Sequence, residues 1–319
     1  MPMITRRQFI RTASALAATG SLVSRVLARA EGLAGTGGIM EARRPFRVGC
    51  SEATLAGANL NDARAAFKIW GEEIRRSLDM SHSEMLPQVF VPSQQMIQMI
   101  RAGDIDCFAI TVVEYSKVAD LVDPSMMAVE AYAEGGIEYI LLVHESSPYK
   151  KIEDLRGAKV GIHHHRDTVL LEPWLAILLA TAGLPSPEQC FGAVESHEDL
   201  TQVILPLFFK RIQVAGVSRR AFEMATELNP QLGRDLRVIA TSPKVVSDGF
   251  FFRQGCDQED KHNFQEGLLR FRSIPAGRQC LALYQSSGFQ LRPCSILKSS
   301  IDLIHQYDHL RKSSRSVAD

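Results

Sequence analysis

Residues 152–168 read IEDLRGAKVGIHHHRDT, and their pattern is the most informative about the fold class. A short apolar strand is predicted over 158–162. The polar segment 163–168 then leads into an apolar helix over 169–182, which we expect to end at Gly183. Another apolar strand, over 137–144, comes before the stretch. Strands that alternate with helices in this way predict a parallel α/β sheet.

The same alternation continues on both sides of this stretch. Toward the amino end we predict strands over 45–50, 85–91 and 105–111, and a helix that Ser93 caps and Gly103 ends. A further helix is predicted from apolar residues at spacings of three and four: Leu60, Ala63, Phe67, Trp70, Ile74 and Leu78. Toward the carboxyl end we predict a helix over about 197–210 with Ser196 as its N-cap, a strand over 211–217, and a helix that begins at Ser218 and closes at Pro230. A strand over 236–241 follows, and from Phe250 we expect one short strand and then mainly helix, ending with 296–310.

Two rounds of strand and helix predict an α/β fold of two doubly wound lobes joined by a two-strand hinge. We expect the chain to cross between the lobes near 143–148 and to return near 241–247. Lobe 1 then comprises 45–143 plus 245–319, and lobe 2 comprises 144–244.

The amino end predicts export. Arg6 and Arg7 precede a weakly apolar run over 13–27, and Ala28-Arg29-Ala30 is typical of a signal-peptidase site. The run is too short and too rich in small residues to span a bilayer. We interpret 1–30 as a twin-arginine type signal peptide and 31–44 as a linker, so the mature protein is expected in the periplasm.

Charge and cysteine content restrict the partners. Five of the 36 basic residues lie within 1–30, which holds no acid, so the mature chain carries 31 basic against 36 acidic residues. This balance argues against a nucleic-acid partner.

Six cysteines are compatible with disulfides in an oxidising compartment, and Cys280 and Cys294 are the pair to test first. Cys50 and Cys107 lie in apolar segments and are expected to be buried and free.

Several segments, in this order and spacing, resemble one family. They are Phe46-Arg47-Val48-Gly49, Ile100-Arg101-Ala102-Gly103-Asp104-Ile105-Asp106, Ile140-Leu141-Leu142-Val143, residues 152–161 and Val194-Glu195-Ser196-His197-Glu198. The chain is similar over roughly 45–290 to phosphonate-type periplasmic substrate-binding proteins of ABC transporters, a branch of the type II periplasmic binding protein architecture. The resemblance implies a ligand held between the lobes, delivery to a transporter permease and no cofactor.

The resemblance also implies a site. Family members that bind phosphonate use a Ser/Thr-rich turn at the first helix of the second lobe, where this chain has the residues 163–168 and keeps one hydroxyl, that of Thr168. Ser196 and His197 match a position near the anion, and Tyr115 matches a cleft tyrosine. These matches to the family, together with the loop 51–54 after the first strand, predict eight ligand-binding residues. They are Ser51, Glu52, Tyr115, His165, Arg166, Thr168, Ser196 and His197. We expect Arg166, Thr168 and His197 to face the cleft together, because ligands in α/β sheets gather at the carboxyl ends of strands.

The three adjacent histidines leave alternatives open. His163, His164 and His165 could line a polar cleft with rings that donate to an organic acid, form a solvated loop, or supply two ligands to a transition metal together with His197 or a cysteine. Motifs typical of catalysis, such as Gly-x-Ser-x-Gly and His-Glu-x-x-His, do not occur. We therefore expect a monomeric binding protein for a small anion or zwitterion, not an enzyme. The alternative functions are a ligand-presenting subunit of a membrane sensor and a metal-binding periplasmic protein.

Overall fold

The computed structural model describes residues 45–55, 61–62, 65, 68–69, 72, 85–130, 136–283 and 286–316. The predicted export signal and linker lie outside these residues. So do all six apolar positions from which we predicted a helix over 60–78, although Asn61, Asp62, Ala65, Lys68, Ile69 and Glu72 are described and helical.

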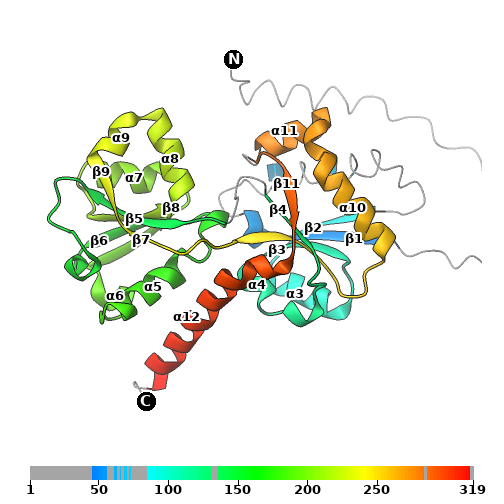
Figure 1. Ribbon diagram of the computed structural model, residues 1–319, viewed down its shortest axis with the longest axis horizontal. Helices are drawn as coiled ribbons and strands as arrows, with labels where there is room; N and C mark the ends of the chain where they lie inside the picture. The colour runs from blue at the N-terminus through cyan, green and yellow to red at the C-terminus, as the bar shows by residue number, and fades with distance from the viewer. Residues whose placement is uncertain are drawn as a thin grey trace, which may run out of the picture. The chain divides into compact units, whose positions relative to one another are not determined.

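The described chain forms two β-sheets, each with parallel and antiparallel strand pairs, and helices pack against them (Figure 1). This confirms the predicted α/β fold class. The first sheet has the strand order β11-β4-β10-β3-β1-β2. Its strands are β1 (Phe46–Ser51), β2 (Met85–Val91), β3 (Cys107–Thr111), β4 (Met127–Glu130), β10 (Asp248–Phe252) and β11 (Phe289–Arg292). The second sheet has the order β7-β6-β8-β5-β9. Its strands are β5 (Tyr139–His144), β6 (Lys159–His163), β7 (Ala193–His197), β8 (Val214–Ser218) and β9 (Leu236–Thr241).

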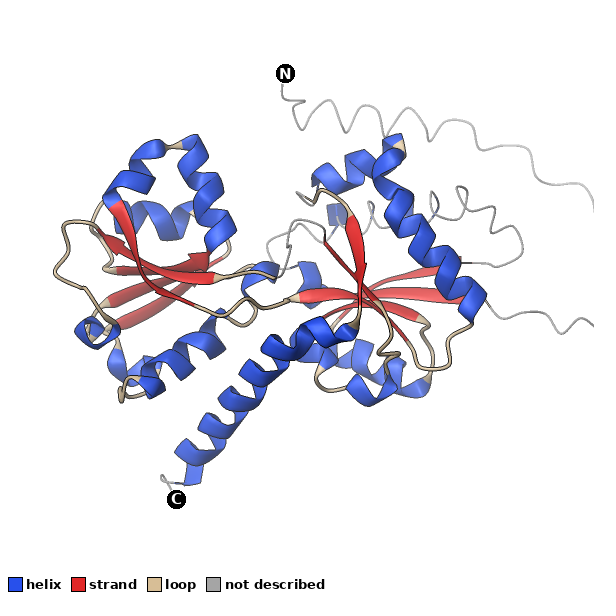
Figure 2. Ribbon diagram, viewed as in Figure 1, coloured by secondary structure: helices blue, strands red, loops and turns tan. Residues whose placement is uncertain are grey.

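Helices cover both faces of the sheets (Figure 2). Those of the first-sheet part are η1 (Glu52–Leu55), α3 (Ser93–Ala102), α4 (Val112–Tyr115), η2 (Ala119–Leu121), α10 (Gln258–Arg270), η5 (Phe271–Ser273), α11 (Pro275–Leu283), η6 (Cys294–Leu297) and α12 (Lys298–Ser316). Those of the second-sheet part are η3 (Ile152–Leu155), η4 (Arg166–Thr168), α5 (Leu171–Thr181), α6 (Pro187–Cys190), α7 (Thr201–Phe208), α8 (Arg219–Leu228) and α9 (Pro230–Asp235). Among the described residues, no helix is both long and apolar enough to cross a membrane.

Strand β5 shows why its sequence is apolar throughout. Tyr139, Leu141 and Val143 pack in one core cluster with Trp174 and other apolar residues of α5. Ile140 and Leu142 point to the opposite face and pack with residues of α7. Because successive side chains of a strand alternate between faces, a strand covered by helices on both sides must be apolar at every position.

The chain passes between the two sheets twice, and the two passages are paired. It leaves the first sheet after Glu130 and returns at Asp248. Ile137 and Val245 form an isolated antiparallel bridge, and the backbone N–H of Tyr139 donates to Ser242 Oγ at 2.8 Å. The first passage is therefore earlier than we predicted. The prediction places 137–143 in lobe 1, but β5 pairs with β8 and β9 in the second sheet.

Other predictions from the sequence are corrected. Residues 193–197 form strand β7 beside β6, so Ser196 and His197 end a strand, and the helix begins only at Thr201. Pro92, not Ser93, is the N-cap of α3. The strands β4 and β11 were not predicted, because they have only four residues each. Gly103 and Gly183 end their helices with positive φ, as we expected.

One prediction about the cysteines is confirmed and another is wrong. Cys50 and Cys107 are buried and free, as predicted. Cys294 is a free thiol too, so the suggested Cys280–Cys294 disulfide is not formed.

A buried ion pair ties α10 to the first sheet. Lys261 Nζ donates to Asp123 Oδ2 at 2.5 Å and to Ser125 Oγ at 2.8 Å, and it lies 5.5 Å from the ring centre of Phe252. The lysine side chain is only 7% exposed. Removing the ammonium would leave the Asp123 carboxylate largely shielded from water without its counter-charge.

Lys261→Ala is expected to lower the free energy of unfolding by about 3 kcal/mol in urea titrations, because it breaks a buried pair. Lys298→Ala is a matched control, since Lys298 pairs with Asp302 at 2.6 Å on the exposed face of α12. The control should cost less than about 0.5 kcal/mol. Equal losses in the two variants would contradict a stabilising role for the buried pair.

Candidate functional site

The turn after β6 is held by its own residues. Thr168 Oγ donates to the carbonyl of His163 at 2.6 Å and accepts the backbone N–H of His165 at 2.9 Å. The backbone N–H of Asp167 donates to His165 Nδ1 at 3.2 Å. These bonds form a reciprocal cap on η4, so the one hydroxyl that the turn retains is engaged within the turn.

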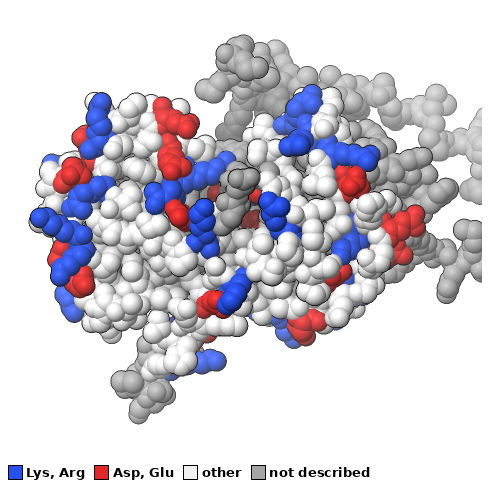
Figure 3. Space-filling model, viewed as in Figure 1, with Lys and Arg blue, Asp and Glu red and all other residues white. Residues whose placement is uncertain are grey.

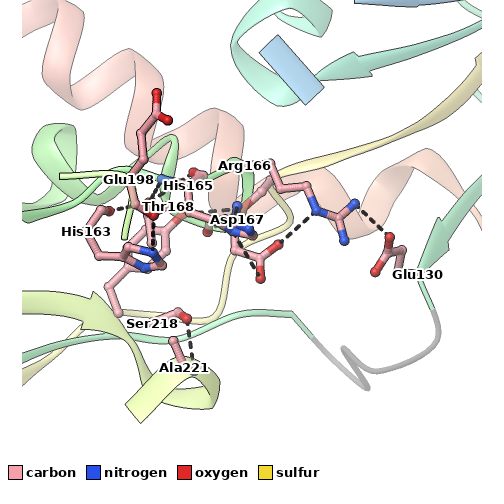
Figure 4. A network of polar contacts seen from close by, with 11 residues as sticks. Glu130, His163, His165, Arg166, Asp167, Thr168, Glu198, Ser218 and Ala221 are labelled. Carbon is pink, nitrogen blue, oxygen red and sulfur yellow. Dashed lines mark hydrogen bonds and ion pairs between the residues drawn. The ribbon is translucent and has the colours of Figure 1, made fainter. Parts of the chain in front are cut away.

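Arg166 extends from this turn to the first sheet (Figure 4). Its Nη1 lies 2.7 Å from Glu130 Oε1, and its Nε lies 4.0 Å from Asp167 Oδ1. The arginine side chain is 14% exposed and that of Glu130 is 10% exposed. This shielded ion pair joins the carboxyl end of β6 to the carboxyl end of β4.

Asp248 is the acid in this region whose surroundings are the most strongly charged. Asp248 begins β10 and is influenced by Glu130, Asp167 and Glu114 together with Arg166. Burial raises the pKa of Asp248 to about 7, the three neighbouring carboxylates raise it as well, and Arg166 lowers it. With a pKa of about 7, the Asp248 carboxyl group is partly protonated at neutral pH, whereas an ordinary aspartate is fully ionised.

The end of β1 faces the same group of carboxylates but is already hydrogen-bonded. Ser51 Oγ donates to Glu114 Oε1, and it lies 3.4 Å from Ser93 Oγ. Glu114 also accepts the backbone N–H of Thr111 at 2.8 Å. Because the Ser51 hydroxyl gives its one proton to Glu114, it has no donor left for a ligand, and the residue is fully buried. The half-buried Glu52 opens η1, which contacts η4.

Tyr115 lies at the end of α4 and is half-buried. Its ring is 4.8 Å from the ring of Phe251, and burial raises the pKa of its phenol. The hydroxyl therefore stays protonated at physiological pH and can donate a hydrogen bond.

Burial favours the neutral form of two of the three adjacent histidines, His163 and His165. The rings of His163 and His165 stack at 5.4 Å. Burial lowers the pKa of both, that of His165 to about 4. Because His165 Nδ1 accepts the Asp167 N–H, the proton of the neutral ring lies on Nε2, which is a donor. His164 is exposed. The described residues contain no group of three or more metal-ligating side chains.

Ser196 and His197 lie beside the turn, on β7. They pair in register with Ile162 and His163, and the carbonyl of His197 accepts the N–H of His164 at 2.8 Å. Ser196 Oγ donates to Glu172 Oε1 at 3.2 Å, and His197 Nε2 is 3.6 Å from Glu195 Oε2. The structure thus brings His165, Arg166 and Thr168 into one turn with Ser196 and His197 on the adjacent strand, while Ser51, Glu52 and Tyr115 belong to the first-sheet part.

A cavity of about 360 Å³ lies along the two passages between the sheets. Its charged lining residues are Glu130, Lys244, Asp248 and Arg292. Sequence reasoning predicted none of them. Two of them could have been found from their positions along the chain. Glu130 ends one strand and Asp248 begins another, at the points where the chain leaves and re-enters the first sheet.

Asp248 should make the stability of the protein depend on pH. Its pKa rises from the usual value near 3.8 to about 7 on folding, so the folded protein keeps a proton that the unfolded chain loses between these values. The contribution of Asp248 to the free energy of unfolding therefore falls as pH rises through this window, by about 1.4 kcal/mol for each unit of pKa difference.

The comparison of the wild-type protein with Asp248→Asn isolates this effect. Depressed histidine pKa values act in the opposite direction, but they are common to both proteins. Relative to the wild type, Asp248→Asn should become more stable from pH 4 to pH 7.5 in urea titrations. A difference that does not change with pH would contradict the raised pKa.

The comparisons with known proteins agree with this fold. A family model described as an ABC transporter, phosphonate, periplasmic substrate-binding protein matches residues 61–291. A comparison with curated proteins finds no match.

Solved structures with a similar fold include the following three. A binding component of a phosphonate ABC transporter from Pseudomonas aeruginosa is 15% identical with a TM-score of 0.54, and the match covers 86% of this chain and 98% of that one. A Xanthomonas citri protein solved with ATP is 14% identical with a TM-score of 0.61, covering 84% and 98%. A Prochlorococcus marinus protein solved with methylphosphonate is 12% identical with a TM-score of 0.54, covering 86% and 98%.

At such identities the structures show the fold, which is that of type II periplasmic binding proteins. The family model spans more than half of the chain, including the whole second sheet and most strands of the first. The chain therefore belongs to the family of periplasmic substrate-binding proteins of phosphonate ABC transporters.

Proposed function

We propose that this protein captures a small anionic or zwitterionic ligand between its two sheets and delivers it to the permease of an ABC transporter. Phosphonate, a phosphate-like compound or a small organic acid are the ligand classes considered. In this proposal the protein acts as a monomer and binds its ligand without changing it chemically.

The observation that carries the proposal is the position of Arg166. It lies in the turn after a parallel strand, at the edge of the sheet where α/β proteins bind ligands. The guanidinium is planar and has several donors, so it can hold a phosphonate or carboxylate through two parallel hydrogen bonds. Its present partner, Glu130 Oε1, is an oxygen anion with the geometry that such a ligand would imitate.

The other ligand contacts that we propose are those predicted from the sequence. His165 would donate through Nε2, and Tyr115 through its phenol. Thr168 would act by holding the turn in place, because its hydroxyl bonds to the backbone of that turn. Ser51, Glu52, Ser196 and His197 complete the proposed set.

Arg166→Ala is expected to weaken binding by roughly 1.5–3 kcal/mol, the range for hydrogen bonds to charged groups. A thermal-shift screen of phosphonates, phosphate, small carboxylates and divalent metals selects the ligand, since a ligand at about one hundred times its dissociation constant adds roughly 2.7 kcal/mol of stability. Calorimetry with that ligand then measures the affinity of wild type and variant.

Arg270→Ala is the matched control. Arg270 also pairs with a carboxylate, Glu266 at 3.0 Å, but it does so on the exposed surface of α10. The control should bind with wild-type affinity. Unchanged affinity in a folded Arg166→Ala protein would contradict the proposed site.

We also propose that the precursor reaches the periplasm through the twin-arginine pathway, as the order of Arg6, Arg7, the apolar run and Ala28-Arg29-Ala30 indicates. Replacing Arg6 and Arg7 by Lys keeps the positive charge but removes the arginine pair. The double variant should accumulate uncleaved in the cytoplasm, as measured by fractionation and immunoblotting. Processing of the variant at the wild-type rate would contradict this route.

A further inference from the structure

The α7–β8 loop, residues 209–213, holds an aromatic side chain out of the fold. Phe209 is 61% exposed, whereas the adjacent Phe208 packs against the apolar cluster beneath α7. The parallel strands β6, β7 and β8 carry the Arg166 turn at their carboxyl ends, and α7 runs back to the amino end of β8. Phe209 therefore lies at the opposite edge of the second sheet from Arg166 and is not part of the candidate ligand site.

The backbone fixes the direction of this ring. The N–H of Arg211 donates to the carbonyl of Pro206 at 2.7 Å, and the N–H of Lys210 donates to that of Leu207 at 2.9 Å. The two bonds form a Schellman motif, in which the residue after the helix cap is left-handed. That residue is Lys210, with a φ of 59°. Glycine is the usual residue there because it has no Cβ, so a lysine at this position indicates that its side chain has a use.

Three basic residues accompany Phe209. The guanidinium of Arg211 lies 6.0 Å from the centre of the Phe209 ring. Lys159, the first residue of β6, is joined to the loop because its carbonyl accepts the N–H of Gln213 at 3.0 Å. Lys159, Lys210 and Arg211 are exposed, and within the described residues no carboxylate forms an ion pair with any of them. Their charges are therefore available to a partner.

The excess of positive charge at the loop is local. Residues 201–222 include four basic residues and no aspartate or glutamate. The whole chain holds 36 basic and 36 acidic residues, and Figure 3 shows the two kinds interspersed over the described face in view. Charges more than about 10 Å away are screened at 0.1 M salt, so the nearby cations decide which partner the loop attracts. An anionic partner is favoured.

The size of the feature favours a lipid surface over a protein. A stable protein interface buries about 800 Å² on each partner, which is more than one loop with one exposed ring supplies. A bilayer interface accepts a single apolar side chain at headgroup depth, and flanking lysine and arginine side chains contact the lipid phosphates. A second apolar side chain lies at the same edge of the sheet, since Leu228 is 90% exposed and ends α8, which also runs back from the carboxyl end of β8.

We propose that the α7–β8 loop binds the surface of an anionic phospholipid bilayer. Phe209 inserts among the headgroups, and the side chains of Lys159, Lys210 and Arg211 contact phosphate groups. One exposed ring with a few cations gives reversible attachment, not a permanent anchor. The inference does not depend on the proposed function, because the loop and the Arg166 turn lie at opposite edges of the second sheet.

Vesicle flotation tests the proposal. The purified protein is titrated with vesicles of phosphatidylglycerol and phosphatidylcholine in equal amounts, and with vesicles of phosphatidylcholine alone. Because each basic residue near an anionic surface contributes about fivefold, binding to the mixed vesicles should be at least tenfold tighter at low salt. It should weaken as sodium chloride is added. Equal binding to the two kinds of vesicle, or no binding to either, would overturn the proposal.

Lys210→Gly separates lipid binding from the structure of the loop. Glycine suits the left-handed backbone, so this variant should melt at the same or a higher temperature while binding the mixed vesicles about fivefold more weakly. Phe209→Ser should weaken binding about tenfold and leave the melting temperature unchanged, because the ring is exposed in the free protein.

Arg270→Ala is the matched control, since it removes one exposed positive charge from α10 in the first-sheet part. It should bind the mixed vesicles as the wild type does. A loss equal to that of Lys210→Gly would mean that attraction is spread over the whole surface, and the proposal would be wrong. It would also be wrong if Phe209→Ser bound normally, or if the protein ignored vesicles and formed dimers that Phe209→Ser abolished, which would assign the loop to a second copy of the chain.

Discussion

The two passages of the chain between the sheets place the charged groups of this protein together. Each passage begins or ends at a strand terminus of the first sheet, and the bridge between Ile137 and Val245 holds one passage against the other. Glu130 ends β4 and Asp248 begins β10, so both carboxyl groups lie at the passages. Arg166 reaches them from the second sheet, and Ser247 Oγ donates to the carbonyl of Asp167 at 2.9 Å. The ion pair and the raised pKa of Asp248 both follow from this convergence.

Bringing several carboxyl groups together away from water lowers the stability of the fold, so such a cluster is expected mainly where it has a function. A buried carboxylate that keeps an unpartnered oxygen, beside an acid with a pKa of about 7, contributes little to the stability of the fold. The Lys261–Asp123 pair shows the contrast, since its ammonium also donates to Ser125 and serves to fix a helix. Strongly perturbed acids next to a cavity are typical of functional sites. For that reason the proposed function places the ligand at Arg166, which pairs with Glu130.

Regular patterns of apolar residues were sufficient for much of the fold. The continuous apolar run of β5 and the glycines that end α3 and α5 were read correctly, because local periodicity and backbone conformation depend on nearby residues alone. Prediction was wrong where an element depends on distant pairing. The residues of strand β7 are largely exposed, and the strand forms because β6 lies beside it, so the prediction of a helix that begins at Ser196 and His197 is wrong. Strand β4 was not predicted because a run of four residues is too short to show a periodic pattern.

Three features could be predicted from the sequence alone: the family resemblance, the alternation of strands and helices, and the polar turn that carries Arg166. Each depends on residues that are contiguous in the chain. Only folding brings Glu130 and Asp248 to Arg166, because each of these acids begins or ends a strand of the first sheet and lies far along the chain from the turn. Folding also engages the Thr168 hydroxyl within its own turn and lowers the pKa of His163 and His165, since burial and hydrogen bonding set both. Electrostatic environment arises from groups brought together by folding, and no local pattern of residues specifies it.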